Sequence, residues 1–199
     1  MKYEDVAEVV QIDRQAFPGE WVFRSQSAYK QDLNNPSVRY MVAYKTNSSE
    51  SEGQTSKVSW FKRLFSGERH LVSPENIVGF TGFWMMLREA HIIAIAVRDR
   101  YRRLGIGEGL LIATIELAQI LNANVVTLEV RASNQIAQEL YRKYDFQVTG
   151  RRPRYYSSDG EDAIIMSTDD ITSVSFQASF QRLKKAHAQA HPEISYQVY

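Results

Sequence analysis

Residues 97–111, VRDRYRRLGIGEGLL, decide the fold, because they join an apolar strand to an apolar-faced helix through a turn that contains Gly105 and Gly107. The run HIIAIAV at 91–97 is nearly continuous in apolar residues, as in a central strand that is buried on both faces. From 107 to 122 the apolar residues recur every 3.6 residues, which predicts a helix packed on the sheet. Backbone amides exposed at the start of such a helix bind anions, so the turn predicts a site for a phosphate-bearing ligand.

The turn itself combines small, basic and apolar residues. The two glycines allow the backbone to approach a pyrophosphate closely, and the two arginines add positive charge. A carboxylate at Glu108 opposes an anion there, although it suits the first turn of a helix. A third glycine at dinucleotide-binding spacing is missing from the motif, and the chain contains no GKS or GKT. The turn comprises Arg102, Arg103, Leu104, Gly105, Ile106, Gly107 and Glu108, and we expect the anion to lie against its glycines and arginines.

Outward from this turn, helical and strand patterns alternate. On the N-terminal side we expect helices over 6–17 and 25–33, ended by Pro18 and Pro36, and strands over 39–44 and 77–86. On the C-terminal side we expect a strand at 125–131, a helix at 134–144, and closing strands at 146–151 and 163–167. This order predicts an α/β fold with a mixed sheet and helices on both of its faces.

Two segments stand outside this pattern. A polar, serine-rich stretch begins at Lys45, and we interpret 45–76 as a flexible insertion. Its apolar residues among Lys62, Arg63 and Arg69 predict either a short basic amphipathic helix that contacts a membrane or partner, or a lid that folds back. We expect the domain to cover 1–170, with 171–199 as a C-terminal appendage in which Phe176, Phe180 and Leu183 share a helical face.

Composition narrows the classes of function. The 199 residues carry a net charge of +1, so no overall field attracts nucleic acid or an anionic membrane. Disulfides and thiolate chemistry are excluded because the chain contains no cysteine, and the spacing of its four histidines does not predict a metal site. The N-terminal 17 residues lack the apolar core of a signal peptide, and no apolar run approaches the length of a transmembrane span, so we expect a cytoplasmic protein.

Three motifs in order resemble a known family. R-x-x-G-x-G after IAV, then EVRASN at 129–134 and LY at 140–141, are similar to the pattern of GNAT acetyltransferases, especially the RimI-type ribosomal-protein alanine N-acetyltransferases. The resemblance runs from about 92 to 166, and more weakly from 5 to 44. It implies the GNAT fold, with a mostly antiparallel central sheet, and acetyl-coenzyme A as acetyl donor. The donor would be bound by the turn described above and by Ile95, Ala96, Val97 and Asn134.

The resemblance also implies two catalytic residues. Alternation in VVTLEVR sends Glu129 to the face opposite Leu128, and the family places its general base at Glu129 and its general acid at Tyr141. A protein α-amino group has a pKa of about 8, so a carboxylate acting through water suffices as base, and a phenol can protonate the departing thiolate. The thioester oxygen would be polarised by a backbone amide near Ala96 or Val97, at an irregularity in the strand.

The acceptor side is the most specific part of the resemblance. RRPRYYSSDGEDAIIM at 151–166 is close to the RimI-type pattern, which implies that the acceptor is a protein N-terminus, with alanine of a ribosomal protein favoured. SSDG is also a turn signal, so the segment is a hairpin on either interpretation. A lysine side chain or small amine stays open as acceptor, because FPGEW at 17–21 departs from the family's Phe-Pro-Trp. A second alternative is that the protein is a non-catalytic module that binds coenzyme A. The expected acceptor residues are Trp21, Tyr155, Tyr156, Glu161 and Asp162.

Overall fold

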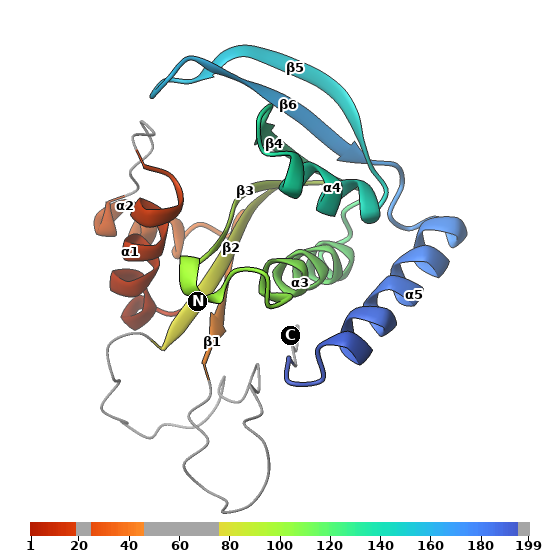
Figure 1. Ribbon diagram of the computed structural model, residues 1–199, viewed down its shortest axis with the longest axis horizontal. Coiled ribbons are helices and arrows are strands. Elements are labelled where there is room, and N and C mark those ends of the chain that lie inside the picture. The colour runs from red at the N-terminus through yellow and green to blue at the C-terminus, as the bar shows by residue number, and fades with distance from the viewer. Residues whose placement is uncertain (19–24, 46–75, 195–199) are drawn as a thin grey trace, which may run out of the picture.

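The structure is a computed structural model that describes residues 1–18, 25–45 and 76–194. Within these residues six strands form one sheet in the order β1-β2-β3-β4-β6-β5, and β3 with β4 is the parallel pair (Figure 1). The strands are β1 (Val38–Tyr44), β2 (Ile77–Met86), β3 (Glu89–Val97), β4 (Val125–Arg131), β5 (Phe146–Tyr156) and β6 (Glu161–Thr168). The helices are α1 (Val6–Ala16), α2 (Gln26–Asp32), α3 (Ile106–Ile120), α4 (Gln135–Lys143) and α5 (Val174–Ala190).

The expected elements form close to their predicted positions, and the mixed sheet with helices on both faces is confirmed. Strands β2 and β4 have the bounds that the sequence predicts. The β5–β6 hairpin is longer than expected, because its pairing continues to Tyr156 opposite Glu161, immediately before the turn. Asp145, immediately before β5, adopts the left-handed conformation with φ of 61°.

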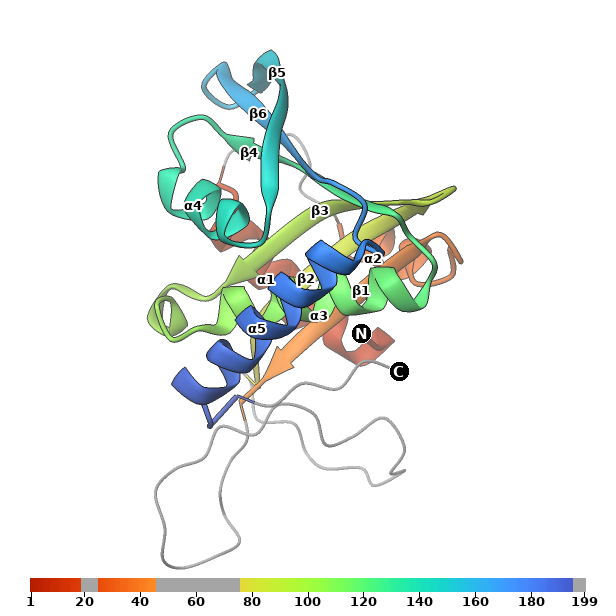
Figure 2. The same ribbon diagram turned by 90° about the vertical axis from the view of Figure 1, so that its right-hand side faces the viewer.

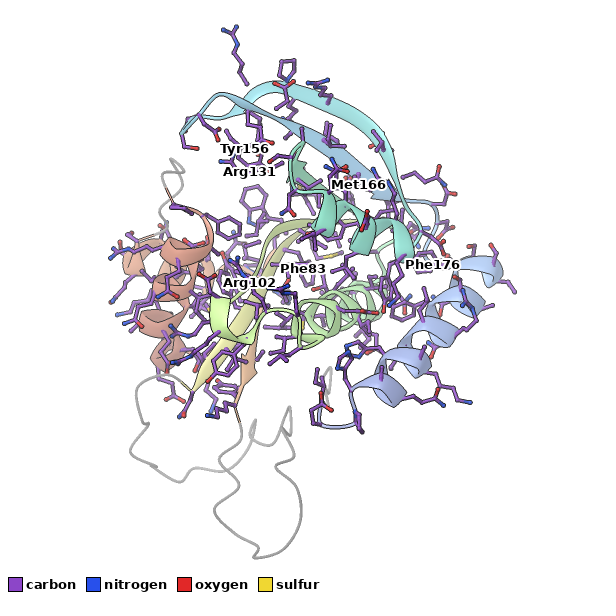
Figure 3. The ribbon with its side chains drawn as sticks, viewed as in Figure 1. Phe83, Arg102, Arg131, Tyr156, Met166 and Phe176 are labelled. Carbon is purple, nitrogen blue, oxygen red and sulfur yellow. The ribbon has the colours of Figure 1, made fainter. Side chains whose placement is uncertain are left out.

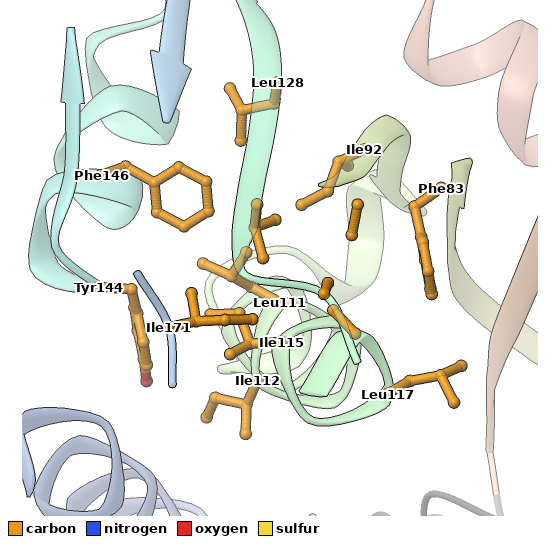
Figure 4. Packing of buried hydrophobic residues seen from close by; sticks show 14 of the residues in the cluster. Phe83, Ile92, Leu111, Ile112, Ile115, Leu117, Leu128, Tyr144, Phe146 and Ile171 are labelled. Carbon is orange, nitrogen blue, oxygen red and sulfur yellow. The ribbon is translucent and has the colours of Figure 1, made fainter. Parts of the chain in front are cut away.

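The sheet separates two layers of helices. Phe80 of β2 packs into a cluster with α1 and α2, whereas Phe83 of the same strand packs into a cluster with α3. Thr81 points to the α3 layer as well, because its hydroxyl lies 3.1 Å from that of Thr114. Leu111 and other apolar side chains of α3 fill the centre of the larger cluster, between the strands and Phe146 (Figure 4). Amphipathic helices on both faces therefore bury the central strands, as their apolar sequences predict.

Strands β3 and β4 separate after a short parallel contact. Their pairing covers only 89–92 of β3 and 125–128 of β4. Immediately after it, the register of β3 against β2 shifts at Ile93, where a bulge places Ala94 opposite Gly82. Beyond this point β4 continues to pair with β6, so the two strands leave an opening in the sheet between 93–97 and 129–131.

The C-terminal segment is not an appendage. Phe176, Phe180 and Leu183 share one helical face, as predicted, but this face of α5 belongs to the main apolar cluster. Of the separate extension that we expected from residue 171 onward, helix α5 is thus packed on the core, because these three side chains complete the core beside Tyr144.

Two other expectations concern membranes and the insertion. The described helices include none that is both long and apolar enough to cross a bilayer. The insertion predicted at 45–76, with its basic apolar stretch around Lys62, lies almost wholly outside the described residues.

Candidate active site

The turn before α3 has the backbone that an anion site requires. Gly105 precedes the helix with φ of 75°, in the left-handed region, and its carbonyl accepts the first helical hydrogen bond from Gly109 N–H at 2.9 Å. The amides at the start of α3 have no carbonyl of the preceding helical turn to bind, so they are available to an anion. Arg102 lies beside this helix start (Figure 3) and pairs with Asp99 at 2.8 Å. The predicted turn residues therefore come together around one helix N-terminus.

The negative charge of Glu108 is balanced by neighbouring side chains. Its Oε1 lies 2.5 Å from Nζ of Lys143 and accepts a hydrogen bond from the Tyr144 hydroxyl at 2.6 Å. Burial raises the pKa of Glu108, but these two hydrogen bonds and the Lys143 charge outweigh burial and lower the pKa below its usual value. The repulsion expected from sequence is offset by Lys143 of α4, which the fold brings to the start of α3.

The opening between β3 and β4 exposes backbone amides of β3. Arg98 N–H donates to Val78 of β2 at 2.9 Å. Because N–H groups alternate between the two sides of a strand, Ala96 N–H points to β2, whereas those of Ile95 and Val97 point into the opening. The expected amide donor near Ala96 or Val97 is therefore better matched by Val97. The expected irregularity lies earlier, at Ile93.

Glu129 lies at the closed end of this opening. It is one residue beyond the last parallel pair, its side chain is 8% exposed, and each carboxylate oxygen lies beside a side-chain nitrogen. Oε2 lies 2.8 Å from Nε2 of His91, and Oε1 lies 3.1 Å from the guanidinium of Arg152. Burial raises the pKa of Glu129, but the hydrogen bond and charge of His91, together with the charge of Arg152, lower it overall. Glu129 is therefore a stable anion and a weak proton acceptor on its own.

Sequence reasoning missed His91. This residue lies in β3 on the same face as Glu129, opposite Thr127 of β4, and its ring stacks on Trp84 with centroids 6.3 Å apart. It is the one polar residue in the run HIIAIAV, and that departure from an apolar pattern is the signal that was available. A polar side chain in a central strand needs a buried partner, and here that partner is Glu129.

The other two predicted residues on the donor side lie on or just before α4. Asn134 caps this helix, and its side-chain oxygen accepts a hydrogen bond from Ala137 N–H at 3.1 Å. Tyr141 is half-buried and packs on Phe146 with ring centroids 5.7 Å apart. Burial raises the pKa of Tyr141 to about 12, so its hydroxyl stays protonated at neutral pH. This is the protonation state that a general acid needs before it reacts.

A pocket of about 420 Å³ lies between the end of α1 and the β4–β6 side of the sheet. Arg131 lines this pocket and pairs with Glu161 at 2.7 Å and with Asp159 at 2.9 Å. Glu161 also accepts a hydrogen bond from Ser133 N–H, and this bond and Arg131 lower its pKa. The pocket is lined by Ala16, Phe17, Pro18, Arg131, Ser133, Ser158, Asp159 and Glu161.

The remaining acceptor-side residues have different positions. Tyr156 lies under Arg131, whose guanidinium carbon is 4.0 Å from the ring centroid (Figure 3), and Tyr155 packs edge-on against Tyr156. Asp162 does not line the pocket, because it pairs with Arg151 and accepts a hydrogen bond from the backbone of Arg154. Of the five residues expected on the acceptor side, Glu161 lines the pocket, and Trp21 lies outside the described residues.

Comparisons with known proteins agree on one family. The model of the acetyltransferase (GNAT) family matches residues 6–146. A Bacillus subtilis protein assigned as a ribosomal protein bS18 alanine N-acetyltransferase is 32% identical over 83% of this chain and 90% of its own length. An N-alpha-acetyltransferase of Sulfolobus acidocaldarius is 28% identical over 82% of this chain and 86% of its own. The fold matches the crystal structure of the ribosomal-protein-S18-alanine N-acetyltransferase from Escherichia coli, with a TM-score of 0.62 and 24% identity over 85% of this chain and 90% of that one.

Proposed function

The chain belongs to the GNAT family of acetyltransferases, and from this premise we propose that it acetylates the α-amino group of a protein N-terminus. The favoured acceptor is an N-terminal alanine of a ribosomal protein. One observation carries the proposal: an ionised, buried Glu129 and its partner His91 lie where β3 and β4 begin to separate. The name of the Bacillus subtilis relative supports the choice of acceptor.

The donor side fits acetyl-coenzyme A, which would supply the acetyl group as a thioester. The amides at the start of α3 would bind the pyrophosphate, beside the left-handed Gly105. Val97 N–H, which points into the opening, would donate a hydrogen bond to the thioester oxygen and stabilise the charge that develops there. Asn134 would contact the donor from the start of α4.

The base is best described as a pair of residues. Glu129 alone is a weak base because its pKa is lowered by His91 and Arg152. We assign proton transfer to His91, directly or through one water, with Glu129 orienting the imidazole through Nε2 and stabilising its positive charge after transfer. The amine would then attack the thioester carbon as its neutral form, and its nitrogen would lose the remaining excess proton to water as the carbon–sulfur bond breaks. Tyr141 would give its proton to the departing thiolate, and its raised pKa keeps that proton available.

The acceptor would enter from the pocket at the end of α1. This pocket is lined by Glu161 and Asp159 beside the single cation of Arg131, so carboxylates outnumber cations among the charged lining residues. Such a balance favours a cationic ammonium group, and Phe17 and Pro18 add apolar contact for a small first side chain.

A panel of acceptors tests this proposal. Acetylation by acetyl-coenzyme A would be followed by mass spectrometry for peptides that differ only in their first residue. The panel also includes a peptide with a blocked N-terminus and one free lysine, and a polyamine. We expect the alanine-first peptide to react fastest and the blocked peptide to remain unmodified. Acetylation of the lysine or the polyamine at a higher rate would instead favour the side-chain or small-amine acceptor. Coenzyme A binding without turnover on any amine would favour the non-catalytic module.

A further inference from the structure

Helix α5 contacts the turn of residues 102–108, here called the cofactor turn because it is proposed to bind the donor. The family model does not cover the part of the chain that contains α5. The family match ends at 146, whereas α5 spans Val174–Ala190. The helix lies along α3 (Figure 2), and a salt bridge joins Lys184 to Glu116 on the facing side of α3. The proposed acetyl-transfer chemistry uses no residue of α5.

The contact between α5 and the turn is a specific hydrogen bond. Nε2 of His187 lies 2.9 Å from the carbonyl oxygen of Gly105, which also accepts Gly109 N–H. A carbonyl only accepts, so His187 donates through Nε2–H. The His187 side chain is buried, and burial lowers its pKa more than the Gly105 carbonyl and Glu108 raise it, which favours the neutral ring.

The residues after α5 extend this contact. The ring of His191 lies 5.0 Å from that of His187, measured between centroids, and packs on Gly105 so closely that a Cβ there would lie 2.6 Å from the ring. Ile194 then packs with Ile106 and Leu110 of α3. The glycine turn is therefore enclosed on one side by the C-terminal segment.

We propose that this segment braces the cofactor turn: His187, through its hydrogen bond to Gly105, and His191, through packing on the same residue, position the α3 amides for the pyrophosphate of acetyl-coenzyme A. The inference rests on the proposed use of this donor. Both histidines are positioning residues, because they act on the donor through the backbone of Gly105.

The brace acts by preorganisation. A glycine turn samples many backbone conformations, and only those with converging amides bind a pyrophosphate. A hydrogen bond that holds Gly105 in the binding conformation lowers the entropic cost of ordering the turn when the donor binds. Loss of the brace should weaken donor binding and leave chemistry on the bound donor unchanged.

Two substitutions of similar size separate the hydrogen bond from packing. His187→Gln keeps a donor close to the position of Nε2, whereas His187→Met fills similar volume without a donor. His191→Ala tests the packing on Gly105, and Gln189→Ala is the control at an exposed position of the same helix. For each protein, titration calorimetry measures the Kd of coenzyme A, steady-state kinetics give kcat and the KM for acetyl-coenzyme A, and thermal unfolding checks the fold.

We expect His187→Met to raise both the Kd and the KM about 3- to 10-fold, the loss typical of one hydrogen bond, with kcat unchanged. His187→Gln should restore most of the affinity, and Gln189→Ala should match the unsubstituted protein. Hydrogen exchange should become faster at the amides of 105–108 in His187→Met without any ligand.

Unchanged Kd in His187→Met with a preserved unfolding midpoint would overturn the brace and leave the proposed function intact. Tighter binding in any of the histidine variants would also overturn it, because α5 would then hinder the donor. If the unsubstituted protein does not bind coenzyme A, the proposed function is what fails. Hydrogen exchange of the turn then still decides whether His187 holds Gly105.

Discussion

Nε2 of His91 lies 2.8 Å from Oε2 of Glu129, and this contact joins β3 to β4 at the place where the two strands stop pairing. Trp84 stacks on the His91 ring, and Arg152 of the β5–β6 hairpin pairs with Glu129. Through Arg152, the pair connects the opening between β3 and β4 with the hairpin that carries the expected acceptor residues.

The first prediction concerns this pair. Both His91→Ala and Glu129→Gln should lower kcat about 100-fold or more, because general base catalysis typically contributes that much. The Kd of coenzyme A should stay unchanged. Glu139→Gln is the control, since Glu139 lies at an exposed position of α4. If His91→Ala keeps full activity in steady-state assays, Glu129 alone is the general base.

The second prediction concerns Tyr141. Replacement by phenylalanine should lower kcat about 10- to 100-fold, because the departing thiolate loses its proton donor. Burial raises the pKa of Tyr141 to about 12, so the effect should be constant from pH 6 to about pH 10. Tyr3→Phe, at an exposed site, serves as the control. An effect of Tyr141→Phe that disappears within this pH range would contradict the assignment.

The two glycines at the start of α3, Gly105 and Gly107, should respond in opposite directions to replacement by alanine. Gly105→Ala should lower the free energy of unfolding by about 1–2 kcal/mol or more, because φ is 75° and the new Cβ would meet the His191 ring. Gly107 has no such conflict, since a Cβ there would lie 3.8 Å from Val97. Gly107→Ala should therefore raise stability by up to about 1 kcal/mol. Equal effects of the two substitutions in urea unfolding would show that the left-handed turn is not required.

Helix α5 should behave as part of the core. Phe180 is 2% exposed and Phe180→Ala should lower the free energy of unfolding by about 3–5 kcal/mol. Val174, on the same helix, is 87% exposed, and Val174→Ala should change it by less than about 0.5 kcal/mol. Chemical unfolding of both variants measures the difference. If Phe180→Ala and Val174→Ala both change the free energy of unfolding only slightly, α5 is not part of the core.

Glu108 should make stability depend on acidic pH. Its pKa is lower in the folded protein than in an unfolded chain, so the ionised carboxylate stabilises the fold above the ordinary glutamate pKa. This contribution is lost as the pH falls through the lowered folded value. In urea unfolding between pH 7 and about pH 3, Glu108→Gln should lose stability less steeply than the unsubstituted protein. Lys143→Met should also make the loss of stability less steep, because the Lys143 ammonium is one cause of the lowered pKa of Glu108. An unchanged slope in Glu108→Gln would contradict this account.

The sequence by itself determined the local elements and the donor motif. Periodicity placed β2, β4 and α3, and the glycine spacing marked the turn before α3, because both depend on residues close together in the chain. Alternation likewise assigned Glu129 to the face opposite Leu128, which the packing of Leu128 in the α3 cluster agrees with.

Only the tertiary structure decided the partners. His91 meets Glu129 because β3 and β4 are parallel neighbours in one register, and His187 meets Gly105 across 82 residues because α5 packs on α3. Strand order, register and helix packing are set by how the whole chain buries its apolar faces, and no local pattern encodes them. The same burial brought Lys143 to Glu108 and made the C-terminal helix part of the core.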